Sequence, residues 1–261
     1  MKISLMVTTY NWKEALEMVL LSVFRQTVPP FEIIVADDGS TEDTRELIDR
    51  MRETTDIPLH HVWHPDEGHR RTVILNKGIA KAQGDYVSQA DGDVILHRNF
   101  IEDQQRFAEP GVFLRGYRVM LDEETSRKAL DSKILKFSPF VKGHLRFSNA
   151  IRSPFLTRLT LGDAPEWRRV FGSNLSYWRE DALTVNGYNE DILGWGPEDT
   201  EFVARLIFNG INRRKLKFAA KQHHLYHPDI SRDKYDGNMD ILKHTLENKL
   251  CTCANGINKL L

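Results

Sequence analysis

The segment EIIVADDGST at residues 32–41 decides the fold of this chain. Its first part lies in an apolar run rich in strand-forming residues, 31–36. Asp37, Asp38 and a glycine-serine turn follow this run. A strand that is apolar at successive positions is buried on both faces, as in a mostly parallel sheet covered by helices. Ligands of such sheets bind beyond the carboxyl ends of the strands, which is where these two aspartates fall.

Strand-like and helix-like segments alternate around this segment. Apolar runs predict further strands at residues 3–9, 59–63 and 85–89. Apolar residues at helical spacing predict helices at 12–26, around Leu47, Ile48 and Met51, and at 72–82. This alternation predicts an α/β domain with a mostly parallel, Rossmann-like sheet flanked by helices. The alternation of strands and helices fades after about residue 110. Beyond that point the sequence predicts an ordered segment at 171–178, a helix near 198–209 and a strand near 215–220.

Composition limits the protein class only broadly. The chain has 261 residues, 41% of them hydrophobic and 28% charged, which suits one globular α/β domain. The net charge of −1 gives no indication of nucleic-acid binding, and no nucleic acid is expected as a partner. Cys251 and Cys253 match neither a zinc-ligand pair nor a redox motif and receive no role. Without a signal peptide or an apolar stretch of about 18 residues, a cytoplasmic location is expected, with contact at the inner face of a membrane left open.

The stretch 126–169 departs from this balance of charge. It contains ten Lys/Arg and three Asp/Glu, a local net charge of +7, together with Phe137, Phe140, Phe147 and Phe155. One interpretation is a solvated connecting segment whose phenylalanines enter the core. The other is a patch that docks on anionic lipid headgroups and brings the chain to a lipid-linked acceptor.

A second acidic cluster follows the strand predicted at 85–89. Asp91 and Asp93 flank Gly92, which lets the backbone turn so that two carboxylates can face one hard cation. A cation held by so few carboxylates takes its other ligands from water and substrate phosphates, which favours Mn²⁺ or Mg²⁺ with a nucleotide diphosphate. Turn formation or helix capping would explain either acidic cluster alone, but two clusters at one sheet edge favour a binding site.

Two later features add candidate residues. In GWGPED, residues 194–199, Trp195 lies between two glycines and offers a flat apolar face of the kind that stacks on sugar rings. Glu198 and Asp199 then open an apolar helix, where carboxylates also serve as ordinary caps and dipole partners. His223, His224 and His227 are expected after the late strand, and a histidine there could complete the coordination of a metal begun by Asp93. His227 is preferred over His224.

Several ordered motifs resemble the family 2 nucleotide-sugar glycosyltransferases, which have the GT-A fold. The motifs of the first half are TYN at 9–11, EIIVADDGST at 32–41, NKGI at 76–79, GDY at 84–86 and DGD at 91–93. The second half is similar to the galactosyltransferase-type C-terminal region through FGSN at 171–174, NGY at 186–188 and GWGPED at 194–199. The resemblance covers roughly residues 1–232. Pro197 stands where the galactosyltransferase pattern often has glycine.

The resemblance also implies roles for individual residues. Asp38 would contact the uracil or ribose, Arg71 would be a donor-binding arginine, and Asp199 would be the general base. The full set of donor-binding residues that it implies is Thr9, Tyr10, Asn11, Asp38, Arg71, Asn76, Asp91, Gly92 and Asp93. Glu198 would hold the acceptor or donor sugar beside the base, and sugar or acceptor contacts would come from Trp195, Gly172 and Asn174. The implied metal ligands are Asp93, Asp91 and His227.

The expected activity is metal-dependent, inverting transfer of a hexose or N-acetylhexosamine from a nucleotide sugar, with UDP the expected nucleotide. The acceptor would be a saccharide or glycolipid in polysaccharide or lipopolysaccharide biosynthesis. Residues 1–110 would form the donor half, 111–232 the acceptor and catalytic half of the same domain, and 233–261 a tail. One alternative is a sugar-phosphate nucleotidyltransferase, although no glycine-rich phosphate loop follows the first strand. The other is a non-catalytic nucleotide-sugar-binding module. The sequence predicts neither the donor sugar nor the oligomeric state.

Overall fold

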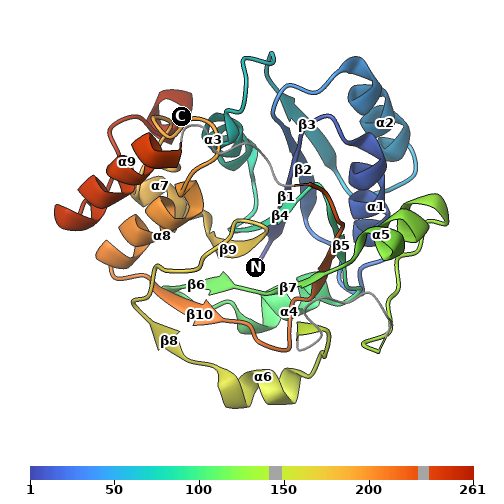
Figure 1. The fold of residues 1–261 in the computed structure, drawn as a ribbon. Coiled ribbons are helices and arrows are strands. Elements are labelled where there is room, and N and C mark those ends of the chain that lie inside the picture. Colours follow the sequence, from blue (N-terminus) through green and yellow to red (C-terminus); the bar gives the residue numbers. More distant parts are fainter. Residues whose placement is uncertain (141–148, 229–234) are drawn as a thin grey trace.

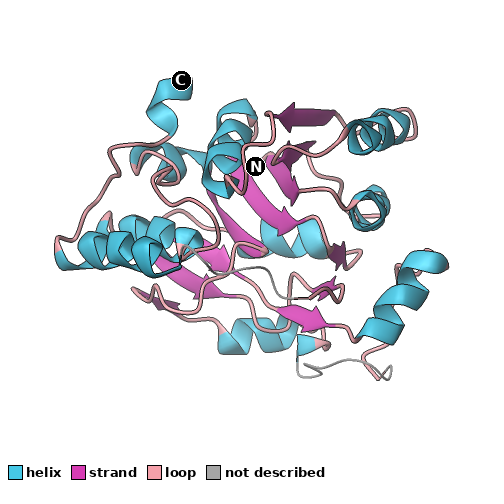
Figure 2. Cartoon of the chain, turned by 45° about the horizontal axis from the view of Figure 1, so that its top comes forward, coloured by secondary structure: helices cyan, strands magenta, loops and turns pink. Residues whose placement is uncertain are grey.

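The structure, a computed structural model, describes residues 1–140, 149–228 and 235–261. It confirms the α/β fold, with one large sheet between layers of helices (Figures 1 and 2). Phe147 of the basic stretch and residues 229–232 of the family resemblance lie outside the described residues.

Strands and helices of the described residues alternate through the first half of the chain, as predicted. The strands are β1 (Ile3–Thr9), β2 (Glu32–Asp37), β3 (Leu59–Trp63), β4 (Tyr86–Asp91), β5 (Val94–Leu96), β6 (Val112–Arg115), β7 (Arg118–Met120), β8 (Asp163–Ala164), β9 (Asn174–Trp178), β10 (Asn212–Lys215) and β11 (Gln222–His224). The helices are α1 (Lys13–Phe24), α2 (Glu42–Arg52), α3 (Arg71–Lys81), α4 (Phe100–Phe107), α5 (Glu123–Asp131), α6 (Pro154–Thr160), α7 (Arg179–Thr184), α8 (Glu198–Phe208), α9 (Tyr235–Glu247) and the 3-10 helix η2 (Ile257–Leu260).

The large sheet joins the two halves of the chain. Its strand order is β3-β2-β1-β4-β9-β6-β10-β8. Strands β1 to β4 pair in parallel, β9 runs antiparallel between β4 and β6, and β10 returns parallel to β6. The carboxyl ends of β1, β4, β6 and β10 therefore meet the start of β9 at one edge of the sheet. A small second sheet, β5-β11-β7, lies beyond this edge.

The apolar runs are buried because helices cover both faces of the sheet. Leu5 and Val7 of β1 pack with α1, α2 and α4, whereas Met6, between them, packs with α3, α7 and α8. Successive residues of a strand point to opposite faces of the sheet. Each apolar strand therefore contributes side chains to the hydrophobic cores on both faces. This arrangement fixes the carboxyl ends of the strands as a rigid base for a site.

The prediction of a strand near 215–220 is wrong. Strand β10 ends at Lys215, and the next strand, β11, begins at Gln222. Between them the chain turns through Phe218 and Ala220, which have positive φ values of 68° and 45°. The apolar residues that suggested a strand are buried as parts of this turn. His223 and His224, expected after the strand, therefore lie inside β11.

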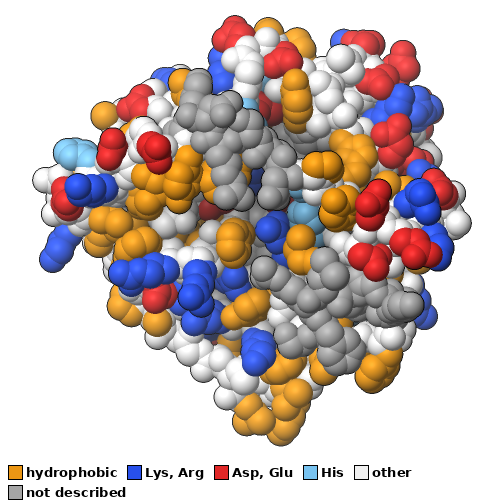
Figure 3. All heavy atoms as spheres, in the orientation of Figure 1, with side chains coloured by type: hydrophobic (Ala, Val, Ile, Leu, Met, Phe, Trp, Pro, Cys, Tyr) orange, Lys and Arg blue, Asp and Glu red, His pale blue; other side chains and the backbone are white. Residues whose placement is uncertain are grey.

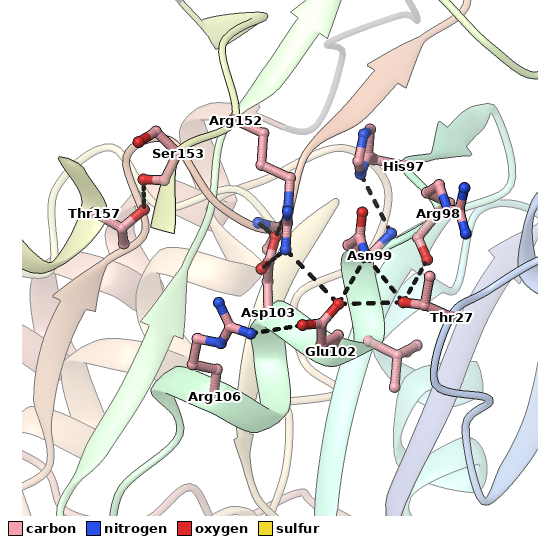
Figure 4. Close-up of polar contacts among 12 residues, drawn as sticks. Thr27, His97, Arg98, Asn99, Glu102, Asp103, Arg106, Arg152, Ser153 and Thr157 are labelled. Atoms are coloured by element: carbon pink, nitrogen blue, oxygen red, sulfur yellow. Dashed lines mark hydrogen bonds and ion pairs between the residues drawn. The ribbon is translucent and has the colours of Figure 1, made fainter. Parts of the chain in front are cut away.

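A buried carboxylate anchors this turn. Asp103 of α4 accepts hydrogen bonds from Arg152 Nε at 2.8 Å and Nη2 at 2.6 Å, and from the Ala220 backbone N–H at 2.9 Å (Figure 4). A bidentate arginine–carboxylate pair has a defined geometry as well as strength. Arg152, from the basic stretch, therefore has a structural role in positioning the chain that leads into β11.

Other parts of the basic stretch are exposed. Phe137 is partly buried against α1 and α5, which fits entry into the core, but Phe140 and Phe155 expose 82% and 69% of their surface. The expectation that the phenylalanines enter the core is thus wrong for these two. Within residues 233–261, α9 packs on α8 and Ile257 of η2 is fully buried near α3. None of the described helices has the length and apolarity that a membrane span needs.

Candidate functional site

A cavity of about 680 Å³ opens at the carboxyl edge of the large sheet. The face shown in Figure 3 is hollowed near its centre, where histidine and basic side chains are visible. Most of the residues predicted from the sequence line this cavity: Thr9, Tyr10, Asp38, Arg71, Asp91, Gly92, Asp93, Gly172, Trp195, Glu198, Asp199 and His227. The structure thus brings residues of both predicted acidic clusters, of the GWGPED segment and of the histidine segment into one site.

Arg71, the first residue of α3, lies among three carboxylates. Its Nη2 donates to Asp91 Oδ1 at 2.7 Å, its Nη1 donates to Thr8 Oγ1 at 2.8 Å, and its Nε lies 3.5 Å from Glu198 Oε1. Burial lowers the pKa of the guanidinium, but Asp91, Asp199 and Glu198 outweigh this and raise it above its usual value. One guanidinium is therefore shared by three carboxyl groups.

The three carboxylates respond differently to this setting. Burial raises the pKa of Asp91, but Arg71 and Arg118 outweigh burial and leave that pKa below its ordinary value. Burial and the neighbouring Asp199 raise the pKa of Glu198 to about 8. Burial also raises the pKa of Asp199, which makes its carboxylate a stronger base than that of an ordinary aspartate.

Asp199 is held by two hydrogen bonds at the base of the cavity. Its Oδ2 accepts from the Gly172 backbone N–H at 2.7 Å, and its Oδ1 accepts from the Tyr188 hydroxyl at 3.2 Å. A Cβ atom at Gly172 would lie 2.5 Å from this carboxylate, so glycine is needed for the backbone to approach. The first turn of α8 and the start of β9 together fix the direction of the carboxylate.

Three potential metal ligands also line the cavity. Asp93, His224 and His227 offer ligand atoms that all lie within 4.8 Å of one another. Asp93 Oδ2 is 3.4 Å from His224 Nε2 and 3.2 Å from His227 Nε2. The hydrogen bond from His227 to Asp93 raises the pKa of His227 to about 9, whereas burial lowers the pKa of His224. Asp91, also predicted as a ligand, is outside this cluster and faces Arg71.

The two aspartates at the end of β2, Asp37 and Asp38, have different roles. Asp37 Oδ1 accepts from the Ser40 backbone N–H at 2.8 Å, which is the turn-forming role that its position suggests. Asp38 lines the cavity, and its two oxygens contact His64 Nε2 at 2.7 Å and the Arg70 backbone N–H at 3.0 Å. Asp38 is thereby held rigidly where a ligand can reach it.

Three predicted site residues do not line the cavity. Asn11 accepts a hydrogen bond from the Thr41 backbone N–H at 2.9 Å and so connects the loops after β1 and β2. Buried Asn76 holds the backbone of Tyr188, the residue that contacts Asp199. Buried Asn174 donates to the Ala220 carbonyl at 2.8 Å. Each of the three side chains holds backbone near the site through hydrogen bonds without lining the cavity itself.

Several lining residues were missed by sequence reasoning. Arg118 and Met120 come from β7, a short strand in the region where the alternation fades. Tyr235 opens α9, and its ring lies 5.2 Å from that of Trp195. Arg118 lies eight residues before the basic stretch 126–169. No motif marks any of these residues.

Comparisons with known proteins find matches to both halves of the chain. The family described as "Glycosyl transferase family 2" matches residues 4–155, and "N-terminal domain of galactosyltransferase" matches residues 161–228. A validoxylamine A glucosyltransferase of Streptomyces hygroscopicus subsp. limoneus is 27% identical over 80% of this chain and 48% of its own length. A putative teichuronic acid biosynthesis glycosyltransferase, TuaG of Bacillus subtilis, is 25% identical over 86% of each chain.

Solved structures show the same fold. TarS of S. aureus superposes with a TM-score of 0.65 at 18% identity, covering 95% of this chain and 40% of that one. The mannosyltransferase PcManGT of Pyrobaculum calidifontis, in complex with GDP-Man and Mn²⁺, gives a TM-score of 0.60 at 19% identity, covering 86% of this chain and 56% of that one. The chain spans about half or less of the first curated relatives that it matches.

Proposed function

Because the chain belongs to glycosyl transferase family 2, we propose that it is a metal-dependent, inverting glycosyltransferase. It transfers a hexose or N-acetylhexosamine from a UDP-sugar to a saccharide or glycolipid acceptor in polysaccharide or lipopolysaccharide assembly. The observation that carries the proposal is that Asp199 faces the same cavity as the cluster of Asp93, His224 and His227. A proton acceptor for the attacking hydroxyl and a cation beside the leaving diphosphate both assist transfer from a nucleoside-diphosphate sugar.

The side chains of the cluster fit a divalent cation. Among the described residues, buried Asp93 Oδ1 has no hydrogen-bond partner, and it is therefore available as a ligand. One carboxylate and two imidazoles can hold a divalent transition-metal ion, with water or phosphate oxygens as further ligands, and Mn²⁺ is the ion that we propose. A bound ion would neutralise the charge that develops on the diphosphate leaving group. In this proposal both histidines are ligands, and Asp91 acts by fixing Arg71.

The donor nucleotide lies across the ends of β1 and β2. Thr9, Tyr10 and Asp38 line this end of the cavity, so the base and ribose bind there. The diphosphate then extends toward Asp93, and the sugar lies between it and the acidic end of the cavity. Glu198 and Trp195 hold the sugar, because both border the cavity beside Asp199.

The transfer itself is a single displacement. The acceptor hydroxyl attacks the anomeric carbon while its proton moves to a carboxylate oxygen of Asp199. The bond from that carbon to the diphosphate breaks, and its electron pair leaves with the nucleoside diphosphate. Attack from the face opposite the leaving group inverts the anomeric carbon, which gives a β-linkage from an α-linked donor.

A panel of nucleotide sugars tests this proposal. With Mn²⁺, one nucleotide sugar should raise the melting temperature and be slowly hydrolysed, and a chelator should abolish both effects. Binding without any hydrolysis would instead favour a non-catalytic module. Pyrophosphate release from a nucleoside triphosphate and a sugar 1-phosphate would favour a nucleotidyltransferase. The same panel identifies the base and the sugar of the donor.

A further inference from the structure

Three buried polar side chains lie behind Asp199. They are Gln89 of β4, Tyr177 of β9 and Tyr188; each is fully buried, and none lines the cavity. The Tyr188 hydroxyl lies 3.2 Å from Asp199 Oδ1 and 3.0 Å from Gln89 Oε1. The Tyr177 hydroxyl lies 3.5 Å from the same Gln89 oxygen. Asp199, which does line the cavity, therefore connects it with this buried polar cluster.

The backbone and the ring of Tyr188 are both held in place. Asn76 accepts a hydrogen bond from the Tyr188 backbone N–H at 2.7 Å and donates one to the Tyr188 carbonyl at 2.9 Å. The Tyr188 ring stacks on Phe202, with 4.4 Å between the ring centres and 13° between the planes. Phe202 follows Asp199 by three residues on α8, so the two side chains lie on one side of that helix. The hydroxyl therefore has a defined position relative to the carboxylate.

The Tyr188 hydroxyl has one hydrogen for two acceptors. It can donate to Asp199 Oδ1 or to Gln89 Oε1, both of which lie within hydrogen-bond distance. An ionised carboxylate is the stronger acceptor of the two, because the hydrogen bond is then assisted by charge. Protonation of Asp199 removes this advantage, and the Gln89 oxygen is the nearer one. The preferred acceptor therefore depends on whether Asp199 carries a proton.

This hydrogen bond opposes the effect of burial on Asp199. The charged and titratable groups that act on Asp199 are Arg71 of α3, Asp91 of β4, Glu198 of α8, Tyr177 of β9 and Tyr188. Burial is the largest influence and raises the pKa of Asp199, whereas Arg71 lowers it. The hydrogen bonds from the Gly172 N–H and from Tyr188 lower this pKa as well. Loss of the Tyr188 hydroxyl would therefore raise the pKa of Asp199 further.

We propose that Tyr188 is a positioning residue for the general base, and that its hydroxyl hydrogen changes partner during transfer. Before transfer the hydroxyl donates to the Asp199 carboxylate and holds it in place. Once the proton of the acceptor hydroxyl has reached Asp199, the Tyr188 hydroxyl turns to Gln89 Oε1. No covalent bond of Tyr188 or Gln89 forms or breaks. The inference rests on the proposed glycosyltransferase function and adds residues that do not line the cavity.

Tyr188→Phe removes the hydroxyl alone. Hydrolysis of the nucleotide sugar that the panel selects is measured against pH, with saturating Mn²⁺ and donor. The acid limb of kcat should move up by about one pH unit, because the ionised form of Asp199 has lost a hydrogen-bond donor. Above the limb, kcat should fall by about tenfold, since the carboxylate is less firmly held. The donor KM should stay within about twofold, because Tyr188 does not line the cavity.

Tyr177→Phe is the matched control. Tyr177 is as deeply buried as Tyr188, its ring lies 5.0 Å from that of the same Phe202, and its hydroxyl faces the same Gln89 oxygen. Its hydroxyl does not hydrogen-bond to Asp199, so the acid limb should stay in place. Both variants are measured at two Mn²⁺ concentrations. A limb set by the metal-binding histidines would move with the metal, whereas a limb set by Asp199 would not.

Gln89→Met tests the second acceptor. The Tyr188 hydroxyl then keeps Asp199 as its strong acceptor, so the acid limb should move down, opposite to its shift in Tyr188→Phe. A Cβ atom at Gly172 would lie 2.6 Å from Gln89 Nε2 and 2.5 Å from Asp199 Oδ1, so the amide nitrogen is also near the carboxylate. The double variant separates this direct effect. Adding Gln89→Met to Tyr188→Phe should leave the limb where Tyr188→Phe places it, because Gln89 acts through the hydroxyl.

The possible failures are distinguishable. Equal limbs in Tyr188→Phe and Tyr177→Phe, or a wild-type limb that follows the Mn²⁺ concentration, overturn the inference and leave the proposed function standing. An unchanged or upward limb in Gln89→Met overturns it as well. Melting temperatures verify folding, and if Tyr188→Phe does not fold, the limb of Gln89→Met decides. If the wild type neither hydrolyses nor transfers from any nucleotide sugar, the proposed function fails and the inference fails with it.

Discussion

Two arginines, one fully buried and one partly buried, lie in very different surroundings. Arg205 of α8 is fully buried and makes two hydrogen bonds to one carboxylate, Glu201, with Nε–Oε1 at 2.8 Å and Nη2–Oε2 at 2.7 Å. Its Nη1 donates to the Val185 carbonyl. Arg71 instead faces a cavity and is shared by Asp91 and Glu198, with Asp199 acting on it electrostatically.

The difference between the two clusters is their charge balance. One arginine and one glutamate at Arg205 leave no charge for a ligand, which is the pattern of a structural pair. At Arg71 one arginine is shared by three carboxyl groups in a cavity, and the pKa of Glu198 rises to about 8, so that Glu198 keeps its proton at neutral pH. Perturbed groups of this kind favour a functional site. The balance therefore separates the arginine of a structural pair from the arginine that we propose binds the donor.

Breaking the balanced pair should have the largest effect on stability. Arg205→Met leaves Glu201 buried without its partner, and we expect the free energy of unfolding to fall by about 3–5 kcal/mol. Urea denaturation measures this change. Adding Glu201→Gln should recover much of the loss, because the uncompensated charge is then removed. A single variant as stable as the wild type would contradict a structural role for this pair.

Removal of a metal ligand should have the next largest effect. His227→Ala should weaken Mn²⁺ binding by about a hundredfold, measured by calorimetry, because one of three protein ligands is lost. His223→Ala is a matched control, since His223 lies next to His224 in β11 and its ring packs 4.6 Å from that of Phe137. Equal losses in the two variants would argue against the proposed ligand set.

The pH dependence of stability should show the smallest effect. The pKa of Glu198 is raised from 4.5 to about 8 in the folded state, so the folded chain binds more protons in this range than the unfolded chain. Its contribution to stability is full below about pH 4.5 and is lost as the pH rises through 8. With a chelator present, Glu198→Gln should therefore flatten the fall in stability across this range. Glu123→Gln, an exposed control, should keep the wild-type slope.

Much of the donor half could be predicted from the sequence. The bounds of β1 and β3 match the predicted ranges, and the acidic ends of β2 and β4 both contribute residues to the cavity. These elements are predictable because strands buried on both faces are continuously apolar. The position of α8 was also predicted, since Glu198 begins an apolar helix.

The second half of the chain was harder to predict from the sequence. Its strands are polar, and ion pairs with residues far away in the sequence stabilise them. Strand β10 has the sequence NRRK, which lacks an apolar signature. Arg214 is nevertheless buried, because Asp163 and Glu109 pair with it at 2.7 and 2.9 Å. These partners lie far from Arg214 in the sequence, so the sequence pattern alone does not predict the pairing. Arg118 was missed for the same reason, since its place depends on β7 pairing with β11.

The central claim is that Asp199 accepts the acceptor proton in a cavity whose donor site is independent of it. The most direct measurement compares donor binding and turnover in the wild type and Asp199→Asn, with the same nucleotide sugar and Mn²⁺. We predict that the dissociation constant of the donor stays within about threefold, while transfer falls by about 10²–10⁴-fold. Loss of donor binding in the variant, or transfer at the wild-type rate, would contradict the account.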